Sequence, residues 1–237
     1  MKTLNVAAFA LNAALYVAAG VFFYSVLPVS FGPVRFWPQA IIPAIFAVVF
    51  GPWVGGLGGA VGIFMNDLIL SGNPVLSLLA GVTSNFAAFF IIGYIANKKT
   101  HWSIPVVGYG VVTAILTGLA LIYTNITFVI VAALSYAFFI VILILFRNSK
   151  WRSLELGSVV GMLVGAAIIG IMVPVYSQFF APQATPFTAP VAIATFLFTF
   201  FTEIPFLIVL GPPIVWAIER AFPFIKQSQE TKEKAKQ

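Results

Sequence analysis

Long apolar segments separated by short turns occupy most of this chain, and they set the first limit on its fold. Eight segments can be traced, at about 4–27, 37–50, 53–70, 75–97, 103–123, 126–146, 155–176 and 188–215. A helix needs about 20 apolar residues to cross a bilayer, and the segments lack the alternation of barrel strands. We therefore predict an all-α integral membrane protein. It is a polytopic helical bundle of about six to eight transmembrane helices, formed by residues 1–222.

The composition also indicates that lipid, and not water, surrounds most of the protein surface. The chain is 61% hydrophobic and only 8% charged, whereas soluble domains carry about 25% charged residues. Its basic residues stand at the ends of the apolar segments and in the tail, so the net charge of +6 indicates membrane topology and not nucleic-acid binding. We expect a multi-pass protein of the cell membrane. The absence of cysteine excludes disulfides and thiolate sites.

The placement of the basic residues predicts the topology. With eight spans and both termini in the cytoplasm, Arg35 alone is outside, as the positive-inside rule favours. A count of six or seven spans stays open if one pair of segments is re-entrant. The residues then placed inside are Lys2, Lys98, Lys99, Arg147, Lys150, Arg152, Arg220 and the four lysines of the tail. The tail, residues 223–237, is predicted to be polar, solvated and cytoplasmic.

Two carboxylates stand out because charge is costly inside a membrane. Asp67, beside Asn66, ends the glycine-rich third segment near an outer loop, where it either caps that loop or contacts a ligand. Arg35 is the candidate partner for Asp67 or for an anionic group of a ligand. Glu203 lies deeper in the last segment, and both a ligand contact and a structural salt bridge remain open for it.

Uncharged polar and aromatic residues extend this candidate set. Asn85 can bond either a ligand or a neighbouring helix. Trp37, in the first outer loop, is either an interfacial anchor or a surface for stacking a flat ligand. Tyr123 and Asn125, at an outer turn, either lie at the rim of a ligand site or serve only to form the turn. The single histidine, His101, has no second histidine with which to build a metal site.

Small residues four apart mark one face of the first segment. Ala10, Ala14 and Ala18 would let another helix approach closely. Either packing inside the bundle or docking to a separate membrane subunit explains them. Repeats of glycine at the same spacing, in 55–62 and 157–165, are predicted to serve internal packing.

Together these features resemble a known family. The alanine face comes first, followed by Pro33 and Arg35 and then by "PQAIIPAIFAVVFGPWVGGLGGAVGIFMNDLI", with a tight turn at Gly51–Pro52. Over residues 4–97 the chain is similar to the substrate-binding S component of energy-coupling factor (ECF) transporters, the vitamin-uptake class of ABC importers.

The resemblance implies a function and partners. An S component binds a vitamin or related micronutrient from outside, in a cavity under its outer loops, and works with a membrane T component and two cytoplasmic ATPases. Ala10, Ala14 and Ala18 would contact the T component. The family core has six helices and this chain has about eight segments, so no ligand position is carried over beyond residue 97. The chain has no G-x-x-x-x-G-K-[ST] motif for binding ATP, which agrees with separate ATPase subunits.

The ligand remains open at this point. Thiamine, riboflavin, biotin, pyridoxine and queuosine-type precursors are all candidates, and Glu203 gives a slight preference for a cation such as thiamine. Competing functions are a membrane scaffold, a stand-alone secondary transporter and an intramembrane enzyme using Asp67 and Glu203. The enzyme is disfavoured because no nucleophile or metal motif accompanies the two carboxylates. We expect no catalytic residue, no metal and no cofactor.

Overall fold

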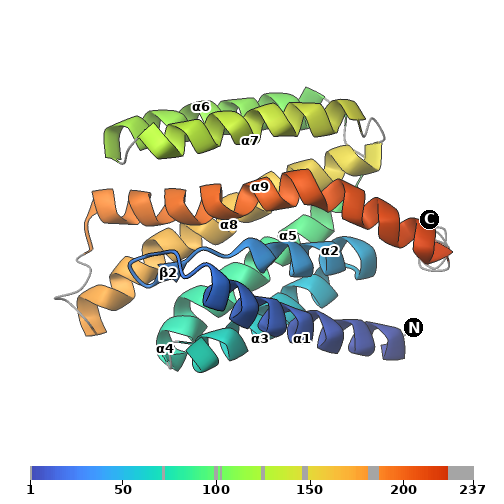
Figure 1. Ribbon diagram of the computed structural model, residues 1–237, viewed down its shortest axis with the longest axis horizontal. Helices are drawn as coiled ribbons and strands as arrows, with labels where there is room; N and C mark the ends of the chain where they lie inside the picture. The colour runs from blue at the N-terminus through green and yellow to red at the C-terminus, as the bar shows by residue number, and fades with distance from the viewer. Residues whose placement is uncertain are drawn as a thin grey trace.

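The computed structural model describes residues 2–70, 73–98, 101, 103–123, 126–145, 149–180 and 187–223. Its long elements are all helices, which lie side by side along one direction (Figure 1). They are α1 (Lys2–Val26), α2 (Ile41–Phe50), α3 (Pro52–Leu70), α5 (Thr83–Ala96), α6 (Ser103–Tyr123), α7 (Ile126–Leu145), α8 (Ser149–Phe180) and α9 (Ala189–Ala221). The prediction of an all-α polytopic bundle is thereby confirmed.

Among the described residues, six helical stretches are long and apolar enough to cross a membrane. The other two apolar stretches are shorter: Pro38–Phe50, made of the 3₁₀ turn η1 (Pro38–Ala40) and α2, and residues Val129–Leu145 of α7. The predicted boundaries agree with the observed ones within a few residues, except that α8 and α9 extend beyond the predicted segments. Both termini of the drawn chain lie at the same end of the bundle (Figure 1). The predicted tail falls outside the described residues apart from Pro223.

Two short elements stand at the end of the bundle opposite the termini. A hairpin of β1 (Ser30–Phe31) and β2 (Val34–Arg35) follows α1. Its two-residue turn begins with Gly32, whose φ of 58° favours glycine. The hairpin is held against α9 by aromatic contacts, with 5.8 Å between the ring centroids of Phe31 and Phe198. This places the hairpin over the end of the helix bundle.

The fourth membrane stretch is not a uniform α-helix. It begins with α4 (Pro74–Leu76), continues as the π-helical segment η2 (Ser77–Val82) and becomes α5. Asn73 caps its start by accepting a hydrogen bond from the Leu76 amide, at 3.0 Å. Segments of π-helix occur frequently at functional sites, and this one lies at the same end as the hairpin.

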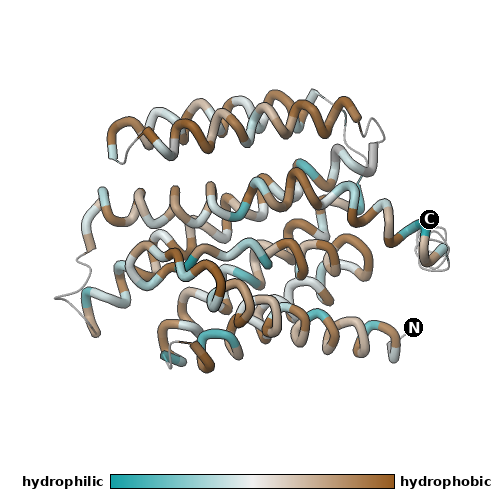
Figure 2. The backbone as a smooth tube through the Cα atoms, in the orientation of Figure 1, coloured by the Kyte–Doolittle hydropathy of each residue, from teal (hydrophilic) through white to brown (hydrophobic). Residues whose placement is uncertain are grey.

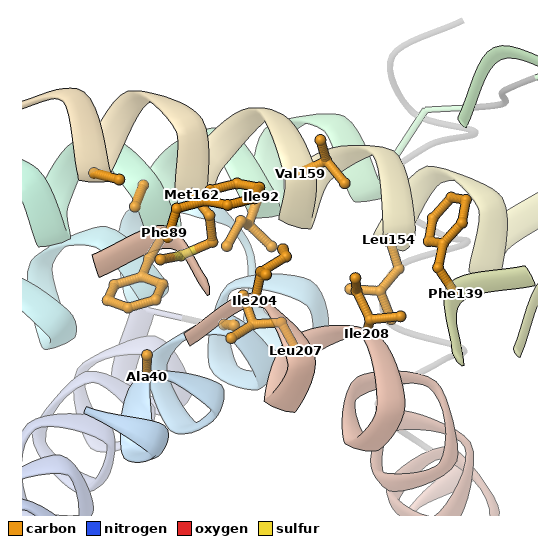
Figure 3. Packing of buried hydrophobic residues seen from close by; sticks show 14 of the residues in the cluster. Ala40, Phe89, Ile92, Phe139, Leu154, Val159, Met162, Ile204, Leu207 and Ile208 are labelled. Atoms are coloured by element: carbon orange, nitrogen blue, oxygen red, sulfur yellow. The ribbon is translucent and has the colours of Figure 1, made fainter. Parts of the chain in front are cut away.

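The hydrophobic core forms where α5, α8 and α9 meet. Figure 3 shows Met162 of α8 beside Ile92 of α5, close to Ile204 of α9. The residues of α6 and α7 are largely apolar, as the brown stretches of these two helices in Figure 2 show. Residues such as Ile122, Ile144 and Leu145 of these two helices are more than 60% exposed, as expected for surfaces that lie in lipid.

Glycines allow α8 to pack closely on α5, as predicted for the 157–165 repeat. A Cβ on Gly161 would lie 2.6 Å from the carbonyl oxygen of Ala88, and a Cβ on Gly157 would lie 2.9 Å from that of Ile92. Such distances are too short for any side chain. The repeat therefore serves contact within the bundle and leaves no space for a larger residue.

We predict that Gly161→Ala lowers the free energy of unfolding by about 1–3 kcal/mol, because its methyl group would overlap backbone atoms of α5. Gly118→Ala on α6 is the matched control, since nothing lies within 4 Å of a Cβ at that position. The control should be neutral or stabilise by about 0.5–1 kcal/mol through helix propensity. Thermal unfolding of the two purified variants in detergent measures the difference, and equal stability would contradict this account of the helix contact.

Candidate ligand-binding cavity

A cavity of about 390 Å³ lies beneath the hairpin, between α3, α5, α8 and α9. Its volume falls within the roughly 300–1,000 Å³ of small-molecule sites. The lining residues come from the end of the bundle opposite the chain termini, where the hairpin and the start of α4 are seen in Figure 1. The cavity is thus placed to receive a ligand from one side of the membrane.

The cavity wall combines three kinds of side chain. Its aromatic members are Tyr24, Trp37 and Phe89. Its aliphatic members include Ile63, Leu76, Met162, Ile169 and Val173. Its charged and larger polar members are Arg35, Asp67, Asn73, Asn85, Thr199 and Glu203. A mainly apolar surface with a few placed polar groups is typical of a site for an organic molecule.

An ion pair joins the hairpin to α3 at this cavity. Arg35 Nη1 lies 3.4 Å from Asp67 Oδ1, and the two side chains are only 14% and 19% exposed. The Arg35 guanidinium also lies 5.1 Å from the centre of the Tyr24 ring. A partly buried charge in a membrane protein needs such partners. The ion pair therefore explains why a carboxylate is tolerated near the end of the glycine-rich helix α3.

The approach of Asp67 to the next helix depends on a glycine of the π-helical segment. A Cβ on Gly81 would lie 2.8 Å from Asp67 Oδ2, so a side chain there would displace the carboxylate. The carbonyl of Gly81 in turn accepts hydrogen bonds from Asn85 Nδ2, at 2.9 Å, and from Ser84 Oγ, at 3.0 Å. Gly81 thus brings Asp67, Ser84 and Asn85 together on one wall.

Behind the cavity wall, a buried tyrosine of α1 connects two lining residues. The Trp37 indole N–H donates to the Tyr16 hydroxyl at 2.8 Å, and this hydroxyl donates to Asn85 Oδ1 at 2.6 Å. Trp37 is only 5% exposed. Its burial and its bond to Tyr16 favour a cavity wall residue over an interfacial anchor.

Five of the predicted ligand-binding residues line this one cavity: Asp67, Asn85, Arg35, Trp37 and Glu203. They come from the hairpin region and three helices, so the fold brings together residues far apart in the sequence. Glu203 has no ion-pair partner among the described residues. A contact between any of the five and a ligand stays a prediction.

Two predicted residues do not line the cavity. Asn66 is fully buried and donates through Nδ2 to the carbonyl oxygen of Tyr16, at 3.1 Å, so it joins α3 to α1. Tyr123 ends α6, is 39% exposed and is not among the residues that line the cavity. Neither residue lines the cavity, and their contact with a ligand stays an untested prediction. Asn125 lies outside the described residues.

Several lining residues were not predicted from the sequence. Thr199 stands four residues before Glu203 on α9 and so shares its helix face, a spacing that signals a polar stripe in an apolar segment. Asn73 lies in the loop before α4, where its amide donates to the Tyr176 hydroxyl at 2.9 Å. The aliphatic residues of α8 carry no chemical signal from which a site could be inferred.

The alanine face predicted for docking lies on the outer side of α1. Ala10, Ala14 and Ala18 are exposed, whereas Ala8, Ala13 and Tyr16 of the same helix are at least 90% buried against the bundle. The first alternative, packing inside this bundle, therefore does not fit these three residues. Their face is available to lipid or to another membrane protein.

Comparisons with known proteins give one finding. The model of the family "ECF-type riboflavin transporter, S component" matches residues 1–152, which include the alanine face, the hairpin, α3 and α5. Searches of curated proteins and of solved structures gave no match. Because the family model covers more than half of the chain, this multi-pass membrane protein belongs to the family of ECF-type transporter S components, which are the substrate-binding subunits of these importers.

Proposed function

We propose that this S component captures riboflavin from outside the cell and delivers it to an ECF importer for ATP-driven uptake. The observation that carries the proposal is the cavity under the hairpin. It is supported by the matching family model, whose description names a riboflavin transporter. That description outweighs the slight preference for a cation drawn from Glu203. With the termini in the cytoplasm, as the charge pattern predicts, the cavity would face outward.

The chemistry of riboflavin suits the composition of the cavity wall. Riboflavin joins a flat tricyclic aromatic ring, with a polar edge of carbonyl and N–H groups, to a hydroxylated chain. Tyr24, Trp37 and Phe89 offer faces and edges for the ring. Asn85, Thr199 and Glu203 offer hydrogen-bonding groups, which suit the polar edge and the hydroxyls. The ligand is uncharged, which agrees with a wall whose Asp67 is already paired with Arg35.

The absence of a phosphate-binding motif supports a division of labour among subunits. We infer that a membrane T component contacts α1 through Ala10, Ala14 and Ala18, and that two ATPase subunits supply the energy. Small residues at this spacing allow close helix contact in lipid, where van der Waals packing provides much of the association energy. The exposed alanine face is the surface of α1 best suited to that contact.

We expect the purified protein to bind riboflavin with one-to-one stoichiometry and without ATP, as measured by quenching of flavin fluorescence. Ala80→Phe should weaken binding at least about tenfold, because Ala80 lines the cavity and a phenyl ring would occupy ligand volume. The matched control is Ala114→Phe on α6, whose side chain is exposed away from the cavity.

The other vitamins form the comparison set for this experiment. Tight binding of thiamine or biotin in place of riboflavin would overturn the proposed ligand while leaving the substrate-binding role intact. A protein that binds none of the vitamins, and from which no small molecule is released on denaturation, would favour a membrane scaffold. Uptake by the chain alone in vesicles would instead support a secondary transporter.

We also predict that Ala14→Trp abolishes co-purification with a T component, because the indole would hold the two helices apart. Riboflavin binding should be unchanged, since Ala14 points away from the cavity. Ala137→Trp places the same bulk on an exposed position of α7 and should leave assembly intact. Normal assembly of the Ala14→Trp protein would exclude the alanine face as the docking surface.

A further inference from the structure

We propose that Tyr16 of α1 is a positioning residue that sets the affinity of the cavity through its hydroxyl group, without contacting the ligand. It would do so by holding Trp37 and Asn85, which line the cavity from two different elements. This inference rests on the proposed function, since it concerns how the same site binds riboflavin.

The geometry places Tyr16 directly behind the cavity wall. Tyr16 is fully buried and does not line the cavity, yet it contacts three residues that do. Its hydroxyl oxygen lies 2.8 Å from Trp37 Nε1 and 2.6 Å from Asn85 Oδ1. Its ring meets that of Phe89 edge to face, with 6.1 Å between the centroids. One side chain thus fixes the base of the hairpin and one face of α5.

The direction of each hydrogen bond is set by the groups involved. An indole N–H only donates and an amide oxygen only accepts. The Tyr16 hydroxyl must therefore accept from Trp37 and give its own proton to Asn85. The other end of the Asn85 amide is fixed as well, because Nδ2 donates to the Gly81 carbonyl at 2.9 Å. The network consequently specifies which edge of the Asn85 amide faces each neighbour.

Loss of the hydroxyl would act on the cavity and leave α1 in place. The Tyr16 carbonyl accepts a separate bond from Asn66 Nδ2, at 3.1 Å. The ring is confined by α3, where a Cβ on Gly62 would lie 2.7 Å from Tyr16 Cδ1. A phenylalanine ring would therefore remain in position, while the Trp37 N–H and the Asn85 oxygen would lose a buried partner. Unpaired buried groups are costly, so both side chains would reorient within the ligand site.

The position of Tyr16 also gives the network a second consequence. Tyr16 shares α1 with the exposed alanine face, but it points to the opposite side of the helix. The hydrogen bonds from its hydroxyl thus connect the wall of the ligand cavity to the helix that we expect to contact the T component.

The first test compares Tyr16→Phe with Tyr94→Phe in the full-length protein. Tyr94 is 52% exposed, lies near Lys98 and does not line the cavity, so the control removes a hydroxyl that the ligand site does not use. Tyr16→Phe should raise the riboflavin Kd by about tenfold or more, which corresponds to the loss of a buried hydrogen bond. Tyr94→Phe should leave the Kd unchanged. Equal affinity of both variants would overturn the inference.

A double-mutant cycle separates positioning from general stabilisation. Trp37→Phe removes the indole donor and also part of the ring surface offered to the ligand, so its effect on the Kd should become smaller, without vanishing, once Tyr16 is already phenylalanine. Additive effects of the two substitutions, or a Tyr16→Phe protein that is less stable but binds with unchanged affinity, would show that the hydroxyl does not position the site.

A readout without ligand keeps this test independent of the ligand's identity. In protein labelled with ¹⁵N-tryptophan, the indole N–H signal of Trp37 is identified by its absence in Trp37→Phe. We expect that signal to shift in Tyr16→Phe, and an unshifted signal would overturn the inference. If the wild-type protein bound no riboflavin, the proposed function would fail, whereas the indole signal would still decide whether Tyr16 holds Trp37.

Discussion

Backbone amides inside a bilayer have no water with which to form hydrogen bonds, and this constraint organises the whole molecule. The described segments that are long enough to cross the membrane are helices, in which these bonds are made internally. The only described strands form the short hairpin at the end of the bundle. Because helix exteriors must also be apolar, polar side chains can collect only between helices or at the ends. The cavity under the hairpin combines both locations.

The Arg35–Asp67 pair shows how the cavity admits charge at low cost. An isolated carboxylate inside a membrane is expensive by roughly 2.5–3.5 kcal/mol on insertion scales. Here the hairpin supplies the opposite charge at 3.4 Å, and the ring of Tyr24 lies against the guanidinium. The pair thereby links a segment that follows α1 to the end of α3. An uncharged ligand can then bind beside it without having to neutralise either group.

The sequence was sufficient to predict the helices because turns and charges interrupt the apolar segments at clear positions. Gly51 and Pro52 illustrate this, since Gly51 has a φ of 106° and Pro52 begins α3. The cavity was harder to predict. Asn66 and Asp67 are neighbours, but successive residues on a helix point about 100° apart, so one bonds α1 and the other lines the cavity. When a helix is apolar on every side, its sequence does not indicate which face turns toward the cavity.

The lining residues of α8 were beyond prediction for a different reason. Met162, Gly165, Ile169 and Val173 resemble any other apolar membrane residues, and only the packing of α8 against α5 turns them toward the cavity. The role of Tyr16 was hidden in the same way. Its partners Trp37 and Asn85 are 21 and 69 residues away along the chain, and nothing in the first segment indicates that they meet.

The π-helical segment Ser77–Val82 has a consequence for how this protein can vary in evolution. Its wider turns fix the rotation of every later residue of α5 relative to the start at Pro74. Deletion of a single amino acid in regular α-helix rotates everything after it by about 100°, whereas a deletion within the π-helical segment would let the backbone return to ordinary α-helical hydrogen bonds without that rotation. After such a deletion Asn85 would keep its place on the cavity wall. Homologues that share this pocket should therefore tolerate a one-residue difference in length within this segment more readily than at other positions before Asn85.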